Sequence, residues 1–100
     1  MYVLMTYDVQ AKRTEKFKKL LRKYLEHIQN SVFSGDLQES KLIELRRAIS
    51  QLLLPGENVT EVTAVNRKNV NVAHYVKHGT GKGEAKRIID TSHVVDFAVL

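Results

Sequence analysis

The hydrophobic pattern along the chain alternates between a strand-like and a helix-like period. Residues 2–8 are apolar nearly throughout and rich in β-forming side chains, which predicts a central strand covered on at least one face. Residues 12–25 and 40–53 repeat apolar positions at helical spacing, and each pattern predicts a helix with one apolar stripe. The stripes are Phe17, Leu20, Leu21, Tyr24 and Leu25 in the first helix and Leu42, Leu45, Ile49, Leu52 and Leu53 in the second. Ser40 is the expected N-cap of the second helix.

The remaining apolar segments have the composition of strands. Residues 27–37 predict two short strands or one bent strand, with Ile28 and Val32 in the core. Ser34-Gly35-Asp36 is expected to form a turn or bulge. The other candidate strands are 58–65, its extension or hairpin partner 70–76, and the two C-terminal segments 86–91 and 94–99.

The resulting order of elements is β-α-β-β-α-β, followed by extra strands. A sheet that carries both helices on one face is the simplest way to bury both apolar stripes. We therefore expect a single α+β domain over residues 1–100, with the ferredoxin-like split β-α-β arrangement.

The charge distribution indicates what kind of molecule the protein binds. The formal net charge is +5, which indicates a polyanionic partner. In the first predicted helix only Glu15 opposes a run of basic residues: Lys12, Arg13, Lys16, Lys18, Lys19, Arg22 and Lys23. This run is either a solvated helix face or a nucleic-acid contact, and the shortage of acids favours the contact.

Composition also excludes some classes of protein. The chain has no cysteine, which excludes disulfides and thiolate metal sites. No apolar run approaches the ~20 residues of a membrane span, and the N-terminal segment lacks the pattern of a signal peptide. We expect a cytoplasmic protein without a membrane partner.

Asp8 is the candidate for metal chemistry because it ends the first predicted strand. Mg²⁺ is usually held by one or two carboxylates plus waters and substrate phosphates. One aspartate per chain therefore suffices if a two-fold axis brings together the Asp8 side chains of two protomers. The alternative is a turn-forming Asp8 that caps the following loop. Tyr7 is expected to point to the opposite face, into the core.

Basic residues that follow Asp8 are candidates for phosphate contacts. Positive charge at the start of a helix is unfavourable with the helix dipole, unless an anion binds there. Phe33 is interpreted either as a core residue or as an exposed ring that contacts nucleic acid. The candidate nucleic-acid-binding residues are Lys12, Arg13, Lys16, Lys19 and Phe33. The alternative for the charges is solubility alone.

Two other kinds of site are disfavoured. His74 and His78 have the spacing of a helical zinc pair, but their surroundings are typical of a strand or loop. A general RNA-binding module stacks bases on paired aromatic rings, whereas residues 32–35 offer one ring only.

Three stretches together resemble the CRISPR-associated protein two family, the small subunit of the spacer-acquisition complex. They are Tyr7-Asp8-Val9, the basic helix that opens at Lys12-Arg13 with Lys16 one turn on, and Gln29-Asn30-Ser31-Val32-Phe33-Ser34-Gly35-Asp36-Leu37. The resemblance covers residues 1 to about 65 and returns at 87–92 and 95–99. The chain departs from the family at Ser34, commonly acidic, and at His27, often arginine.

The resemblance implies a ferredoxin-like homodimer in which residues 84–100 form a strand that crosses to the partner's sheet. It implies a prokaryotic, CRISPR-associated endonuclease that depends on Mg²⁺ or Mn²⁺. The enzyme would act in spacer acquisition, an antiviral defence, and cut single-stranded RNA or duplex DNA with Asp8 from both protomers. The alternative is a dimeric scaffold without catalysis that holds spacer DNA for the CRISPR integrase.

Overall fold

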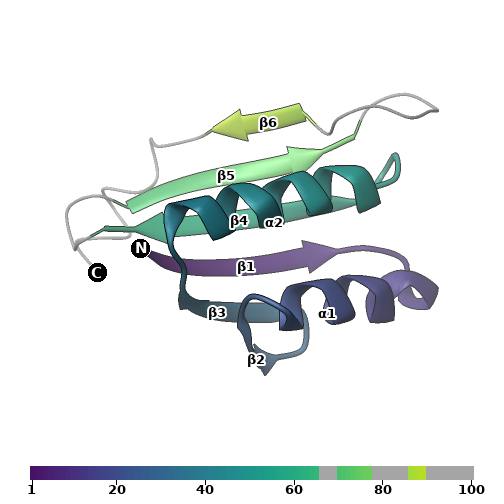
Figure 1. Ribbon diagram of the computed structural model, residues 1–100. Helices are drawn as coiled ribbons and strands as arrows, with labels where there is room; N and C mark the ends of the chain where they lie inside the picture. Colours follow the sequence, from purple (N-terminus) through teal and green to yellow (C-terminus); the bar gives the residue numbers. More distant parts are fainter. Residues whose placement is uncertain (66–69, 78–85, 90–100) are drawn as a thin grey trace.

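The computed structural model describes residues 1–65, 70–77 and 86–89. The elements in these segments are β1 (Tyr2–Asp8), the 3-10 turn η1 (Ala11–Arg13), α1 (Thr14–Arg22), β2 (Glu26–Gln29), β3 (Val32–Asp36), α2 (Glu39–Leu52), β4 (Asn58–Ala64), β5 (Val70–Val76) and β6 (Lys86–Ile89). Figure 1 shows the two helices side by side in front of one twisted sheet. This arrangement confirms the predicted α+β class.

The sheet has the order β2-β3-β1-β4-β5-β6, and every neighbouring pair is antiparallel. The first four strands in this order reproduce the predicted ferredoxin-like arrangement, with β1 in the interior of the sheet. β5 is the hairpin partner of β4, and β6 adds to β5 of the same chain. The exchange of residues 84–100 with a partner stays a prediction, and the candidate strand 94–99 lies outside the described residues.

Strand alternation divides the sheet into two faces. The odd-numbered residues of β1, β4 and β5 point toward the helices, and those in the middle of each strand are buried. The apolar core lies between this face and the helices. It consists of Val3, Met5, Tyr7, Phe17, Leu21, Leu25, Phe33, Leu42, Leu45, Ile49, Leu53, Val59, Ala73 and Tyr75. Both predicted helix stripes contribute to it, with Leu20, Tyr24 and Leu52 partly buried at its edge.

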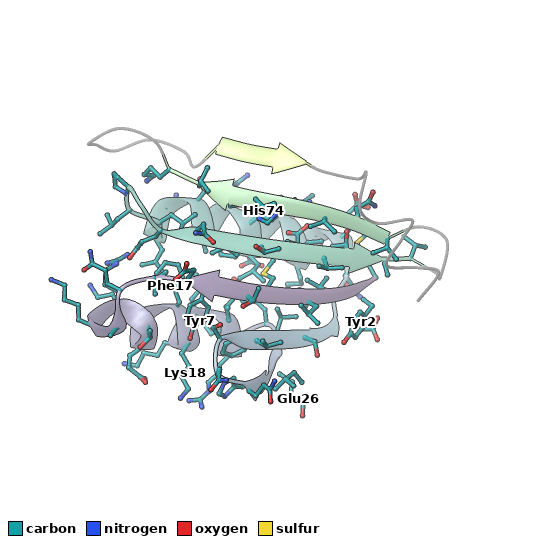
Figure 2. All side chains as sticks on the ribbon, turned by 180° about the vertical axis from the view of Figure 1, so that it is seen from behind. Tyr2, Tyr7, Phe17, Lys18, Glu26 and His74 are labelled. Carbon is teal, nitrogen blue, oxygen red and sulfur yellow. The ribbon has the colours of Figure 1, made fainter. Side chains whose placement is uncertain are left out.

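The even-numbered residues of the same strands form the opposite face, which no described helix covers. We call it the uncovered face (Figure 2). Leu4, Val62 and Val72 lie in one cross-strand row on it and are half-buried. The next row toward Asp8 is polar and contains Thr6, Thr60 and His74.

Several local predictions are wrong. The first helix ends at Arg22 rather than at residue 25, because Lys23 and Tyr24 turn the chain into β2. Ile28 is 54% exposed instead of buried, since it is the extra residue of a bulge between His27 and Gln29.

The predicted turn at residues 34–36 and the predicted cap of the second helix are also wrong. Residues 34–36 belong to the regular ladder between β3 and β1, and the chain turns earlier, at Asn30, whose φ is 44°. The N-cap of α2 is Gln38, without a side-chain hydrogen bond, and Ser40 lies inside the helix.

A buried ion pair joins α2 to the sheet. Arg46 donates from Nε to Glu61 Oε1 at 2.9 Å and from Nη2 to Glu61 Oε2 at 2.6 Å. Glu61 is 1% exposed and lies on the helix-covered face of β4. Hydrogen bonding to Glu61 raises the pKa of Arg46 further above its ordinary value.

Candidate metal and nucleic-acid site

Asp8 is an exposed residue at the end of β1, on the uncovered face. It lies opposite Asn58 in the ladder between β1 and β4. Among the described residues its carboxylate has no hydrogen bond or ion pair, which disfavours the alternative that Asp8 caps the following loop. Both carboxylate oxygens are therefore available to a cation or to water.

Tyr7 anchors the end of β1 from the other side, as predicted. Its ring is 8% exposed and stacks on Phe17 and Phe33, with ring centroids 5.5 and 6.1 Å away. Burial raises the pKa of Tyr7, Glu15 raises it further, and Arg22 opposes the shift. The buried ring fixes the backbone that immediately precedes Asp8.

A cavity of about 310 Å³ lies beside Asp8 at this end of the sheet. Its lining residues are Asp8, Val9, Gln10, Pro55, Gly56 and Glu57. The second carboxylate in this lining, Glu57, is already engaged by Arg13 and by the Leu54 backbone N–H. In the part of the chain that the structure describes, no three His, Cys, Asp or Glu side chains gather as a metal site. Among the described residues, one chain thus offers Asp8 alone to a metal at this position.

Arg13 does not extend from the start of the helix as predicted. Its Nε lies 2.5 Å from Glu57 Oε2, and its Nη2 donates to Glu57 Oε1 at 3.1 Å and to the Leu52 carbonyl at 2.7 Å. The side chain is 12% exposed. Its partner Glu57 is distant in sequence, so the pattern of residues 12–25 could not reveal the pair.

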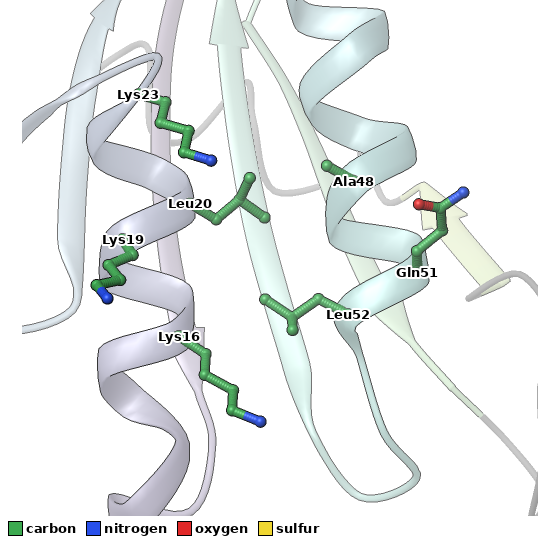
Figure 3. A pocket seen from close by; sticks show the side chains of 7 residues that line it. All are labelled: Lys16, Lys19, Leu20, Lys23, Ala48, Gln51 and Leu52. Atoms are coloured by element: carbon green, nitrogen blue, oxygen red, sulfur yellow. The ribbon is translucent and has the colours of Figure 1, made fainter.

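Three lysines on and just after α1 lie at a different place from Asp8. Lys16, Lys19 and Lys23 line a groove of about 370 Å³ between α1 and α2, together with Leu20, Ala48, Gln51 and Leu52. Figure 3 shows Leu20 and Leu52 facing each other across the groove, with Lys16 and Lys23 toward its two ends. None of the described residues that line it is acidic. Because the helices cover the face opposite to Asp8, the groove and Asp8 lie on opposite faces of the sheet.

Lys12 is an exposed residue of η1. In the sequence it lies between Asp8 and Lys16, the first lysine of the groove. Of the predicted basic residues, the structure thus brings Lys16 and Lys19 together in the groove and ties Arg13 to Glu57.

The prediction that Phe33 contacts nucleic acid is wrong. The ring is fully buried and stacks on His27, with ring centroids 4.6 Å apart. It belongs to the core, the alternative that the sequence had left open.

The sequence also missed a polar row on the uncovered face next to Asp8. The Oγ1 atom of Thr60 lies 2.9 Å from Nδ1 of His74, and the hydroxyls of Thr6 and Ser31 are 3.0 Å apart. The sequence did contain a signal for this row, because Thr6 and Asp8 are two residues apart on one strand and therefore point to the same face. His78, which the sequence considered together with His74, lies outside the described residues.

Similarity to known proteins decides the family. Residues 1–71 match the family described as CRISPR associated protein Cas2. The chain belongs to this family. The match spans β1 to the beginning of β5, and it confirms the resemblance noted from the sequence.

The Cas2 relatives agree in fold and in name. The CRISPR-associated endoribonuclease Cas2 of Thermotoga maritima is 47% identical over 70% of this chain and 80% of the relative. The protein of the same name from Methanosarcina acetivorans is 29% identical over 89% of this chain and 100% of the relative. A solved structure described as "Crystal structure of cas2" superposes with a TM-score of 0.59 at 38% identity, over 61% of this chain and 70% of that chain. These names support the prediction that this Cas2 chain is a nuclease.

Neither described helix has the length and apolar character that crossing a bilayer requires.

Proposed function

We propose that the chain is a metal-dependent endonuclease that acts in CRISPR spacer acquisition in the cytoplasm, and that Asp8 from two protomers hydrolyses phosphodiester bonds. The observation that carries the proposal is the exposed Asp8 carboxylate at the end of β1, without a partner among the described residues. The names of the Cas2 relatives support an RNA substrate, and the resemblance extends the proposal to duplex DNA.

A homodimer through the uncovered face would complete the site. Leu4, Val62 and Val72 give this face a half-buried apolar row that a second copy can cover. Two facing Asp8 carboxylates repel unless a cation lies between them, so the pair would favour a divalent ion.

The donor set fits Mg²⁺ or Mn²⁺. Hard cations of this kind need few carboxylates because waters and substrate phosphates complete the coordination. When bound, the ion supplies Lewis-acid chemistry that lowers the pKa of a water and neutralises charge developing on the phosphate. Asp8 binds the ion, Tyr7 holds the strand end in place, and Lys12 attracts the phosphate chain toward it.

A cleavage assay with Asp8→Asn tests the proposal, and Asp36→Asn is the matched control. Asp36 is also an exposed aspartate at a strand end, but it lies at the opposite end of the sheet, across from Tyr2. With Mg²⁺ or Mn²⁺, Asp8→Asn is expected to cut single-stranded RNA or duplex DNA about 100-fold more slowly than the parent, while Asp36→Asn cuts normally. EDTA should abolish cleavage. Equal rates for the parent and Asp8→Asn would refute the role of Asp8.

The groove between α1 and α2 favours a second candidate, the scaffold that holds spacer DNA for the CRISPR integrase. Lys16, Lys19 and Lys23 gather there away from Asp8, so phosphate binding on the helix face does not require cleavage chemistry. Lysines of this kind neutralise phosphates and release counterions.

Charge reversal separates the two functions. The triple variant Lys16→Glu/Lys19→Glu/Lys23→Glu is expected to lose duplex binding and spacer acquisition. The slope of the logarithm of the binding constant against the logarithm of salt concentration should become shallower by about 0.9 for each lost phosphate contact. Lys41→Glu, on the exposed start of α2, is the control. If Asp8→Ala supports acquisition while the triple variant does not, the scaffold is the role used in the cell. Unchanged DNA affinity in the triple variant would refute the groove as a phosphate site.

A further inference from the structure

We propose, building on the metal role assigned to Asp8 above, that the Arg13–Glu57 ion pair is a positioning device for the Asp8 carboxylate. It joins the loop that leaves Asp8 to the loop that enters β4. Both loops line the cavity beside Asp8. The pair would therefore hold Asp8 in one direction without touching substrate or metal.

The chain path makes the coupling short. From Asp8 the chain runs through Val9 and Gln10 into η1, and the Arg13 N–H donates to the Gln10 carbonyl at 2.8 Å. Glu57 immediately precedes Asn58, the residue opposite Asp8 in the ladder. The segment from Asp8 to Arg13 is thus fixed at both ends to the same stretch of chain.

The loop before β4 is held by the same two side chains. Glu57 Oε1 accepts the Leu54 N–H at 2.9 Å, and the Glu57 N–H donates to the Leu54 carbonyl at 3.0 Å. The bond from Arg13 Nη2 to the Leu52 carbonyl adds the last turn of α2. With Arg13 12% and Glu57 4% exposed, the pair is largely shielded from water, and its forked geometry permits little movement.

The same geometry argues against a phosphate contact for Arg13. Its Nε and Nη2 donors are directed at Glu57 and Leu52, inside the protein. Groups that orient a metal ligand typically change metal affinity or activity by about 10- to 100-fold when they are removed. A phosphate contact would instead change the affinity for nucleic acid and its salt dependence.

The Arg46–Glu61 pair provides a matched control. It has the same bidentate chemistry, and its carboxylate is equally buried. Glu61 lies opposite Met5, in the middle of β1, and neither member of the pair lines the Asp8 cavity. Breaking it should destabilise the fold without acting on Asp8.

The test compares Arg13→Gln, Glu57→Gln, Arg13→Lys and the control Arg46→Gln in the full chain. Three quantities are measured for each variant: Mn²⁺ affinity from the EPR signal of the free ion, kcat and KM for single-stranded RNA, and the thermal midpoint. Measurements are made well below that midpoint. Glu57→Gln keeps the shape and one oxygen acceptor, so it is the milder substitution and serves as the second variant if Arg13→Gln unfolds.

We expect Arg13→Gln and Glu57→Gln to weaken Mn²⁺ binding about 10-fold and to lower kcat by a similar factor, with KM within about twofold of the parent. Arg13→Lys should recover part of both losses, because the charge remains while the fork is lost. Arg46→Gln should lower the thermal midpoint and leave Mn²⁺ affinity and kcat unchanged.

Three results would overturn the proposal. Normal Mn²⁺ affinity and kcat in folded Glu57→Gln would show that the pair does not position Asp8. A rise in KM alone in Arg13→Gln, with a weaker salt dependence, would assign Arg13 to phosphate binding. If Arg46→Gln lost as much Mn²⁺ affinity as Glu57→Gln, the loss would be explained by general destabilisation of the fold and not by the positioning of Asp8. Failure of the proposed function is distinct, because then Asp8→Asn itself binds Mn²⁺ and cleaves as the parent does.

Discussion

The buried Arg46–Glu61 pair gives the sharpest prediction about stability. Replacing Arg46 by Leu leaves the Glu61 carboxylate 1% exposed and without its two charge-assisted hydrogen bonds, at 2.6 and 2.9 Å. The Tyr75 hydroxyl at 3.4 Å would remain, but that distance is long for a strong O–H···O bond. Arg46→Leu therefore leaves an uncompensated charge in the core.

The expected cost follows from the burial. Removing one partner of a buried ion pair costs about 3–5 kcal/mol, and the lower end applies because the Arg46 side chain is 24% exposed. A loss of about 3 kcal/mol lowers the thermal midpoint of a domain of this size by more than about 10 °C. The double variant Arg46→Leu/Glu61→Leu should return to within about 1 kcal/mol of the parent, since no charge is then stranded.

Urea unfolding measures the free-energy cost of the single variant and of the double variant. Far-UV circular dichroism is the probe because the chain contains no tryptophan for fluorescence. Protein concentration must be fixed, as a dimer's midpoint depends on it. A cost below about 1 kcal/mol for Arg46→Leu, or a double variant as unstable as the single one, would refute the argument from the stranded carboxylate.

Three further predictions follow from burial and backbone geometry. Because burial raises the pKa of Tyr7 above its ordinary value of 10.0, the stability that Tyr7 contributes is full below that pH and is lost as pH rises through the folded-state pKa. Tyr7→Phe should therefore flatten the alkaline fall in unfolding free energy, and equal falls in the two proteins would contradict this. Phe33→Ala should lower the free energy of urea unfolding by about 3–5 kcal/mol, whereas Ile28→Thr, at the exposed bulge, should change it by no more than about 0.5 kcal/mol. A larger cost for Ile28→Thr than for Phe33→Ala would contradict the assigned burial. Gly56→Ala should cost about 1–2 kcal/mol because the φ of Gly56 is +87°, although its added methyl group would touch nothing within 4 Å; an unchanged melting curve would argue against the left-handed turn.

The elements that local periodicity encodes were predictable. β1 follows from seven consecutive residues, and the buried pair Phe17 and Leu21 follows from helical spacing within α1. Packing of both helices on one face follows from their stripes, because each stripe needs the same sheet to cover it.

The misplaced residues depend on partners that are distant in sequence. Ile28 has the composition of a core residue, but the register between β2 and β3 makes it the extra residue of the bulge. Gly35 suggested a turn, whereas it pairs with Val3 in the regular ladder between β3 and β1. Neither constraint is visible in the local pattern.

The candidate site was predictable in part for the same reason. Asp8 is found from its position at a strand end, which is a local property. The engagement of Arg13 by Glu57 and the gathering of Lys16 with Leu52 require the packing of α1 against α2. Charge in a sequence indicates a partner, but it does not distinguish an internal carboxylate from an external phosphate.

The alternation of β1 side chains between the two faces of the sheet has a consequence for how this protein can evolve. Its odd positions Val3, Met5 and Tyr7 are committed to the core, while Leu4, Thr6 and Asp8 look outward from the same seven residues. Substitutions at the outward positions can alter assembly or chemistry at little cost to folding, and those at the inward positions do the reverse. A scan of every substitution along this one strand would accordingly yield two interleaved tolerance profiles, one recording selection for folding and the other selection for activity.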